Sequence, residues 1–197
     1  MPAATMPAAP RAQADTQTRL RELMLHIATH EQDNRRFGAT KLNKILFYCD
    51  FLWYLRTGDS ITGATYQKLD HGPAPRELLP ARASLIKEKA ARMERRPMAL
   101  PYRAQTRLVP TRNADLSVFS SEEIAFVDQV MGSLRDASAE VASLMSHRHL
   151  GWQLADFRED IPYFTALLCD NVALPSDIER GIELARERGW TTESMSA

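Results

Sequence analysis

The feature that most constrains the fold is a segment that would be apolar around most of a helix. It begins near Lys41 and reads KLNKILFYCDFLWYLRTG. One helix face would carry Leu42, Ile45, Leu46, Cys49, Leu52 and Trp53, and Tyr48, Phe51 and Leu55 would widen it. Only a narrow polar sector with Asn43 and Asp50 is left. Other elements normally surround such a helix, so the sequence predicts a central buried helix that Thr40 caps and Gly58 ends.

Shorter signals predict the elements around this helix in the first half. Residues 18–30 carry Leu20, Leu23, Met24 and Ile27 on one stripe, which predicts an amphipathic helix. Residues 62–69 are expected to be extended. Pro80 is expected to break or kink a helix that resumes over residues 83–91. Residues 93–98 and 106–109, separated by proline-rich turns, are predicted to pair as a small antiparallel hairpin.

The second half is predicted to be helical. Ser120 and Glu123 have the spacing of a capping box, and Ser138 is expected to start a helix that carries Val141, Leu144 and Met145. A turn-rich stretch is expected over residues 147–162. Ser176 with Glu179 then predicts a last helix, closed by Gly189. The fold class is therefore mainly α (α+β): a single helical domain around a central buried helix, with a small β-hairpin.

Composition favours one domain. The chain has 197 residues, of which 44% are hydrophobic, enough for a sizeable single core. No apolar run approaches the length of a transmembrane helix, so no membrane partner is expected. Residues 1–17, rich in Ala and Pro, are predicted to be a disordered N-terminal tail. Cys49 and Cys169 lack metal-ligand spacing and are expected to be inert core thiols, which fits a reducing cytoplasm.

The residues that could carry catalysis are few. His147 and His149 stand two apart with no nearby cysteine, so we expect no metal site and no cofactor. A turn or helix-end role is favoured for His147, with Trp152 packed over the helix end. No P-loop, GxGxxG or GxSxG pattern is present. The sequence therefore gives no case for catalysis, and we expect that the protein is not an enzyme.

Charge is unevenly distributed although the formal net charge is zero. Residues 82–112 contain nine Lys or Arg against Glu88 and Glu94. One interpretation is a DNA-binding transcriptional regulator that uses this basic stretch. No helix-turn-helix, zinc finger or single-strand platform accompanies it, so a nucleic-acid partner is the weaker interpretation. A second interpretation is an acidic protein partner, and a third is that the charged residues only form solvated helix faces.

Several motifs in order resemble a known family. The chain reads Lys41-Leu42-x-Lys44-Ile45-Leu46-Phe47-Tyr48, then Thr57-Gly58, then Gly72-Pro73, then Leu144-x-Ser146-His147, Gly151-Trp152 and Ile161-Pro162-Tyr163. This order resembles the Panacea domain of SocA-like antitoxins, the phage-associated GepA-like group, over about Leu20 to Tyr163. The resemblance implies a Panacea-like antitoxin domain over residues 18–190, followed by a flexible C-terminal tail over residues 191–197.

The resemblance also implies a function. SocA-like proteins are bacterial cytoplasmic antitoxins that bind a cognate toxin, without enzymatic activity, and some deliver the toxin to the ClpXP protease. The tail over residues 1–17 would offer an exposed segment to such a protease, although terminal tails often have no function.

One corner of the chain is the predicted partner-binding site. Its residues are Tyr66, Asp70, His71, Gly72, Pro73 and Arg76. Proline restricts the residue before it, so Gly72-Pro73 forms a rigid corner that would present side chains at low entropic cost. Tyr and Arg are also common in binding hot spots. The alternative is that Gly72-Pro73 only turns the chain.

Overall fold

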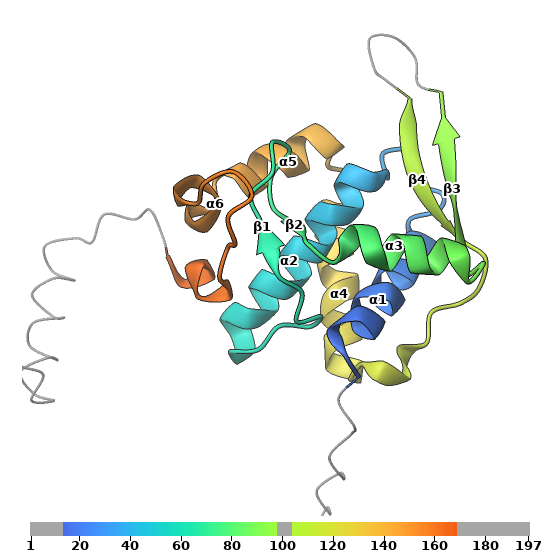
Figure 1. Cartoon of the computed structure of the whole chain (residues 1–197), viewed down its shortest axis with the longest axis horizontal. Helices are drawn as coiled ribbons and strands as arrows, with labels where there is room; N and C mark the ends of the chain where they lie inside the picture. Colours follow the sequence, from blue (N-terminus) through green and yellow to red (C-terminus); the bar gives the residue numbers. More distant parts are fainter. Residues whose placement is uncertain (1–13, 98–103, 169–197) are drawn as a thin grey trace, which may run out of the picture.

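Helix α2, Ala39–Thr57, runs through the middle of the molecule (Figure 1). The structure is a computed structural model that describes residues 14–97 and 104–168. Helices α1 (Thr16–His30), α4 (Ser121–Leu134) and α5 (Ala139–His147) all pack against α2. The predicted central helix and the mainly helical fold are thus confirmed. No helix within the described ranges is both long enough and apolar enough to span a bilayer.

The ends of α2 differ from the prediction in two respects. Gly38 and not Thr40 is the N-cap, with no side-chain cap, whereas Gly58 closes the helix in the left-handed region (φ 84°) as predicted. Leu52 and Leu55 were expected on the buried face but are 41% and 45% exposed. The last turns of α2 are covered mainly through Phe51 and Trp53, which pack on Tyr163 and Phe126.

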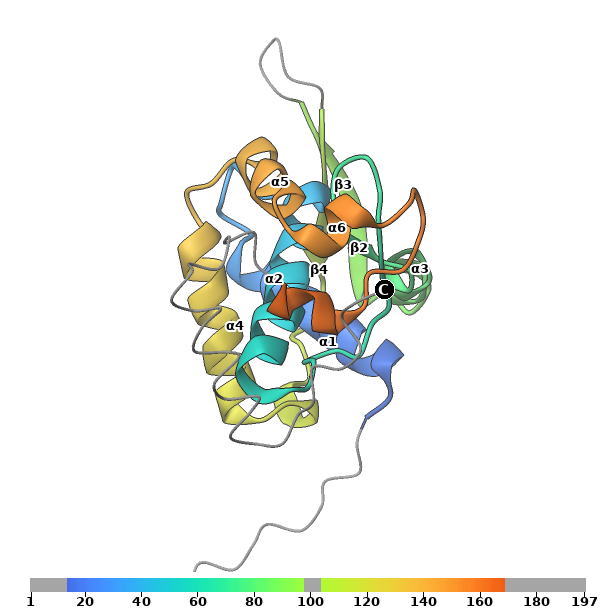
Figure 2. The same cartoon turned by 90° about the vertical axis from the view of Figure 1, so that its left-hand side faces the viewer.

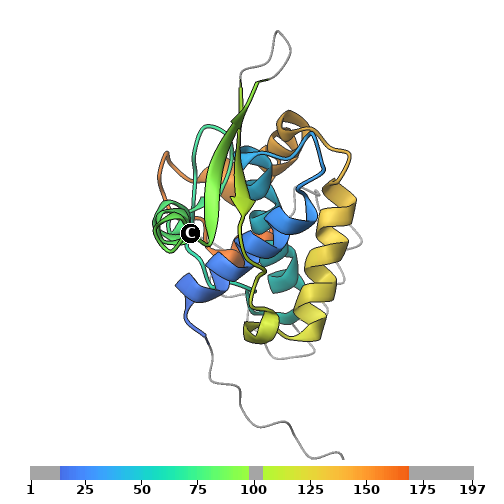
Figure 3. The same cartoon turned by 90° about the vertical axis from the view of Figure 1, so that its right-hand side faces the viewer.

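Helix α1 begins two residues earlier than predicted. Asp15 caps it, because its side chain accepts a hydrogen bond of 2.8 Å from the Thr18 N–H. The apolar stripe on α1 is buried as expected, and Leu20, Leu23, Met24 and Ile27 have no exposed surface. Helices α1 and α4 lie side by side (Figures 1 and 3).

A short hairpin connects α2 to α3. Strands β1 (Tyr66–Gln67) and β2 (Ala74–Pro75) pair antiparallel, with Tyr66 opposite Pro75. Helix α3 then spans Leu78–Lys87 without interruption. The predicted break at Pro80 is wrong because Pro80 is the third helical residue, and N–H groups of the first turn have no intrahelical acceptor to lose.

The second hairpin packs against α1 and α3 at its base, and its far end extends beyond the helices (Figure 1). Strands β3 (Ala91–Arg96) and β4 (Gln105–Pro110) pair antiparallel, from Ala91 opposite Pro110 to Arg96 opposite Gln105. The predicted hairpin is confirmed in kind, although both strands start earlier along the chain. The helix expected to reach residue 91 instead ends at Lys87, and Lys89 turns the chain with φ 56°.

The second half keeps its predicted caps. Ser120 and Glu123 form the capping box of α4, and the Ser138 side chain caps α5. The stretch expected to be turn-rich contains the short helix α6 (Leu150–Leu154), which follows α5 in Figure 2. The 3₁₀ segments are η1 (Leu116–Val118) and η2 (Tyr163–Leu167). Cys169, the last predicted helix, residues 1–13 of the predicted N-terminal tail and the whole predicted C-terminal tail lie outside the described residues.

Candidate partner-binding surface

Asp50 anchors the segment that follows α2. Its carboxylate is fully buried and accepts three hydrogen bonds: from the Thr62 N–H (2.7 Å), the Thr62 hydroxyl (2.5 Å) and the Tyr66 hydroxyl (2.8 Å). Burial raises the pKa of Asp50 to about 6 even though these donors oppose the shift. Asp50 therefore fixes the chain over residues 62–66.

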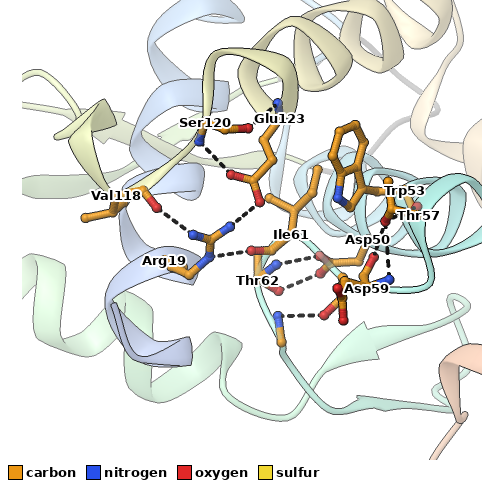
Figure 4. A network of polar contacts seen from close by, with 12 residues as sticks. Arg19, Asp50, Trp53, Thr57, Asp59, Ile61, Thr62, Val118, Ser120 and Glu123 are labelled. Carbon is orange, nitrogen blue, oxygen red and sulfur yellow. Dashed lines mark hydrogen bonds and ion pairs between the residues drawn. The ribbon is translucent and has the colours of Figure 1, made fainter. Parts of the chain in front are cut away.

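A second anchor lies beside it. The Arg19 guanidinium donates to the carbonyl oxygens of Ile61 and Val118 and to a Glu123 carboxylate oxygen, each at 2.5 Å (Figure 4). These acceptors come from three separate segments, so one side chain of α1 ties the start of α4 to the segment after α2. The Glu123 carboxylate also accepts from the Ser120 N–H in the capping box.

Tyr66 was predicted to face a partner, and the structure corrects this. Its side chain is 1% exposed, its hydroxyl is bonded to Asp50, and its ring packs edge-on against Phe47 and Phe51. A side chain committed in this way is part of the core. The sequence does not distinguish the two roles, because tyrosine is common both in cores and at interfaces.

The predicted corner is a tight turn between β1 and β2. The Gly72 N–H donates to the Leu69 carbonyl (2.9 Å), and Gly72 adopts a φ of 97°, which only glycine takes up without strain. A Cβ at Gly72 would lie 2.4 Å from both the Lys44 Nζ and the Ser146 Oγ. Gly72 and Pro73 are buried, so they shape the turn and contribute no contact surface.

Asp70 and His71 are the exposed residues of this turn. The Ser143 hydroxyl of α5 donates to the His71 carbonyl (2.5 Å), so the turn is docked on α5. Arg76 is exposed as well but follows β2 at the open end of the hairpin, where it pairs with Asp160 (2.5 Å). The structure therefore does not bring Arg76 together with His71.

Lys44 lies under the turn and is nearly as buried as Asp50. Its side chain is 1% exposed, and its ammonium donates one hydrogen bond, to the Pro73 carbonyl (3.2 Å). Burial lowers the pKa of Lys44 to about 7. The sequence analysis did not predict the burial of Lys44, because spacing along a helix does not show which of its polar residues another element covers.

An exposed apolar ridge runs along α5 beside this turn. Val141, Leu144 and Met145 are 47%, 59% and 46% exposed and share one face, whereas Ala142 and Ser146 on the other face are buried. The sequence predicted the helix and its apolar residues but not their exposure. Grouped exposed apolar side chains are typical of protein interaction sites.

The ridge continues into a hollow of about 710 Å³ at the start of α5. Val141 belongs to both, and Arg35, Arg36 and Glu140 add charge to the wall. Arg36 also donates to the Asp136 carbonyl, which joins the link before α2 to the link before α5. We define the α5 surface as this ridge and hollow with the adjoining turn residues Asp70 and His71.

The two histidines at the end of α5 take part in packing. His147 stacks on Trp152, with ring centroids 4.0 Å apart and an interplanar angle of 6°, as predicted for a helix end. His149 packs edge-on against Phe47 and Phe51. Burial lowers the pKa of both imidazoles, which favours their neutral forms.

Part of the basic stretch is used internally. Arg107 is 2% exposed and donates to the backbone carbonyls of Glu31 and Gln32. Arg112 binds both carboxylate oxygens of Glu22, at 2.7 and 2.5 Å. These two of the nine cations hold the fold together, which weakens the argument for nucleic acid.

Comparison with known proteins identifies the family. The family model for antitoxin SocA-like, Panacea domain, matches residues 42–153, which run from α2 to α6. No curated protein and no solved structure matches the chain significantly. The match covers more than half of the sequence and contains most of the central helix, the β1–β2 turn and the exposed ridge of α5. The chain therefore belongs to the SocA-like antitoxin family with a Panacea domain.

Proposed function

We propose that this protein is a cytoplasmic antitoxin that binds its cognate protein toxin directly and that the α5 surface makes the contact. Membership of the SocA-like family supports an antitoxin role and a protein partner in general. The proposal adds a surface and a mode of action: neutralisation by binding, without catalysis.

The exposed apolar ridge is the main observation that supports the α5 surface as the site of toxin contact. Three apolar side chains that stay about half exposed on one helix face are unfavourable in water and gain stability when a partner covers them. The hollow next to them adds two exposed arginines, and arginine is frequent among residues that dominate binding energy. The surface thus offers an apolar centre with a polar rim, the usual arrangement of protein interfaces.

The supporting scaffold is rigid. The turn that carries Asp70 and His71 is tied to α5 by the Ser143 bond and filled from below by Lys44. A preorganised surface loses little conformational entropy when it binds.

The test is a pull-down of the tagged protein from its native host, followed by mass spectrometry, with two matched variants. Leu144→Asp places a charge on the ridge, and Leu79→Asp places the same charge at an equally exposed leucine on α3 (59% and 60% exposed). We expect Leu144→Asp to lower toxin recovery at least about tenfold, because a truncated hot spot costs about 2 kcal/mol and a buried unpaired charge costs more. Leu79→Asp should bind normally.

Each outcome has a clear meaning when both variants melt at the wild-type temperature. Recovery of one small protein that Leu144→Asp loses and Leu79→Asp keeps supports the proposal. Equal recovery with both variants would move the contact to another surface. Recovery of DNA without a protein partner would instead favour a regulator.

We propose delivery of the toxin to the ClpXP protease as a second form of neutralisation. A second pull-down experiment tests it. The tail expected to touch the protease, residues 1–17, lies mostly outside the described ranges. The pull-down is repeated in a host without active Clp protease. Toxin enriched under that condition supports delivery, whereas equal amounts support blocking alone.

A further inference from the structure

Two histidines of α1 and one aspartate of α4 form a cluster that the proposed function does not use. His26 and His30 are four residues apart on α1, so their side chains lie on one helix face. The His26 Nε2 lies 2.9 Å from an Asp128 carboxylate oxygen, and the ring centroids of the two histidines are 4.3 Å apart. One ligand atom from each residue lies within 4.8 Å of the other two.

The orientation of His30 suits a metal ligand. Its Nδ1 lies 3.0 Å from the His26 carbonyl oxygen. A carbonyl only accepts hydrogen bonds, so Nδ1 carries the proton and the lone pair of a neutral His30 is on Nε2. Metal-bound histidines commonly use their second ring nitrogen in this way, which fixes the tautomer and the orientation of the ring.

His26 and Asp128 add an imidazole and a carboxylate to the His30 imidazole. His26 is 4% exposed and directs its Nε2 toward Asp128, whose side chain is 49% exposed. Two imidazoles and one carboxylate are the ligands that zinc and related divalent metals accept, and water can take a further position. His30 and Asp128 are both exposed, so an ion can reach the cluster from solvent.

We propose that His26, His30 and Asp128 bind a divalent transition metal of the zinc class and that this metal links α1 to α4. The ion replaces the hydrogen bond between His26 and Asp128 with one bond to each residue. The proton on the His26 Nε2 moves to Nδ1, so His26 stays neutral. The sequence signal is a His-x₃-His spacing on a predicted helix, but the third ligand is about 100 residues away and only the fold reveals it.

The competing explanation is a plain hydrogen bond. His26 and Asp128 would then tie α1 to α4 without a metal, and His30 would only hydrogen-bond to the His26 carbonyl oxygen. The two explanations differ in one respect: the hydrogen bond between His26 and Asp128 does not need the His30 Nε2, whereas the metal site does.

Isothermal titration of the full chain, freed of its tag and of metal, with zinc chloride decides between them. We expect one zinc per chain, with Mg²⁺ giving no heat. His30→Ala should weaken zinc binding at least about tenfold, because even the loss of a residue that only supports a metal ligand commonly costs 10- to 100-fold. His71→Ala, which removes another exposed histidine, should bind zinc like the wild type and serves as the matched control.

A second variant guards against a folding defect. Asp128→Asn keeps a hydrogen-bond acceptor for His26 but removes the charge, and it should weaken zinc binding while the protein stays folded by circular dichroism. Absence of zinc binding in the wild type would overturn the proposal. Binding that is equal in the wild type, His30→Ala and Asp128→Asn would overturn it as well, because the zinc would then occupy another part of the chain.

Discussion

Among the charged side chains that helix α2 buries, Lys44 and Asp50 lie less than two turns apart and differ in their hydrogen-bond partners. Asp50 receives three hydrogen bonds from two residues of one segment, whereas Lys44 makes one hydrogen bond to a backbone carbonyl. Burial shifts the pKa of each toward the neutral form, to about 6 for Asp50 and about 7 for Lys44. A buried charge with a full set of partners fixes the chain around it, whereas one with a single partner mainly carries a desolvation penalty.

Replacement of Asp50 by alanine should have the largest effect. It would leave the Thr62 N–H, the Thr62 hydroxyl and the Tyr66 hydroxyl without their acceptor inside the core. Each unsatisfied buried group costs about 1–3 kcal/mol, so we expect a loss of about 3 kcal/mol or more in the free energy of unfolding. Urea denaturation measures it. A loss below about 1 kcal/mol would mean that Asp50 is no anchor.

Replacement of Gly72 by alanine tests how tightly the turn is packed over Lys44. The new Cβ would meet the Lys44 Nζ and the Ser146 Oγ at 2.4 Å, in a backbone conformation that disfavours alanine. We expect a loss of about 2 to 3 kcal/mol, since strained backbone and overpacking each cost about 1–3 kcal/mol. In a Lys44→Ala background the loss should be smaller, and simple additivity would show that the two residues do not compete for space.

The pH dependence of the free energy of unfolding should reveal the lowered pKa of Lys44. Its folded pKa of about 7 lies below the ordinary lysine value of 10.5, so the unfolded chain binds more protons between these two pH values. Stability from this group therefore rises with pH across that window, by about 1.4 kcal/mol per unit. From pH 7 to pH 9, the free energy of unfolding of the wild type should rise by about 2 kcal/mol relative to that of Lys44→Met.

Urea denaturation at both pH values measures that difference. Lys44→Met keeps most of the length of the side chain and removes the amine, so titrating groups that do not interact with Lys44, including Cys49 and Tyr66, cancel between the two proteins. A difference that does not change with pH would show that the amine is solvated or paired in the folded state.

Replacement of Tyr66 by phenylalanine should have the smallest effect. It removes one of the three donors to Asp50 and leaves the ring packing on Phe47 and Phe51 in place. A single hydrogen bond to a charged group contributes about 1.5–3 kcal/mol, and the two remaining donors reduce the loss to about 1 kcal/mol. Toxin recovery in the pull-down should be unchanged, because Tyr66 is internal. Reduced recovery at unchanged stability would return Tyr66 to the partner surface.

Local signals predicted the helices and their ends well. The capping box at Ser120, the N-cap at Ser138 and the glycine end of α2 each depend on a few neighbouring residues, and all three are confirmed. The wrong prediction of a helix break at Pro80 also came from a local signal. Proline breaks a helix only after the first turn, and the sequence did not reveal where α3 begins.

The candidate site was predicted less well. The Gly72-Pro73 turn is present, but Tyr66 and Pro73 are buried, and Arg76 is at the other end of the hairpin. Spacing along the chain shows which side chains share a helix face. It does not show whether another element covers that face, which is why the exposure of Val141, Leu144 and Met145 was missed.

The sequence by itself determined the family, the central helix and most of the caps, because these follow from residue order and from interactions over three or four positions. Only the tertiary structure decided where the polar residues lie. Lys44 and Asp50 are buried because the β1–β2 turn and the segment after α2 fold over them, and His26 meets Asp128 because α1 packs beside α4. Contacts between distant segments depend on packing the whole chain, and no local pattern encodes them.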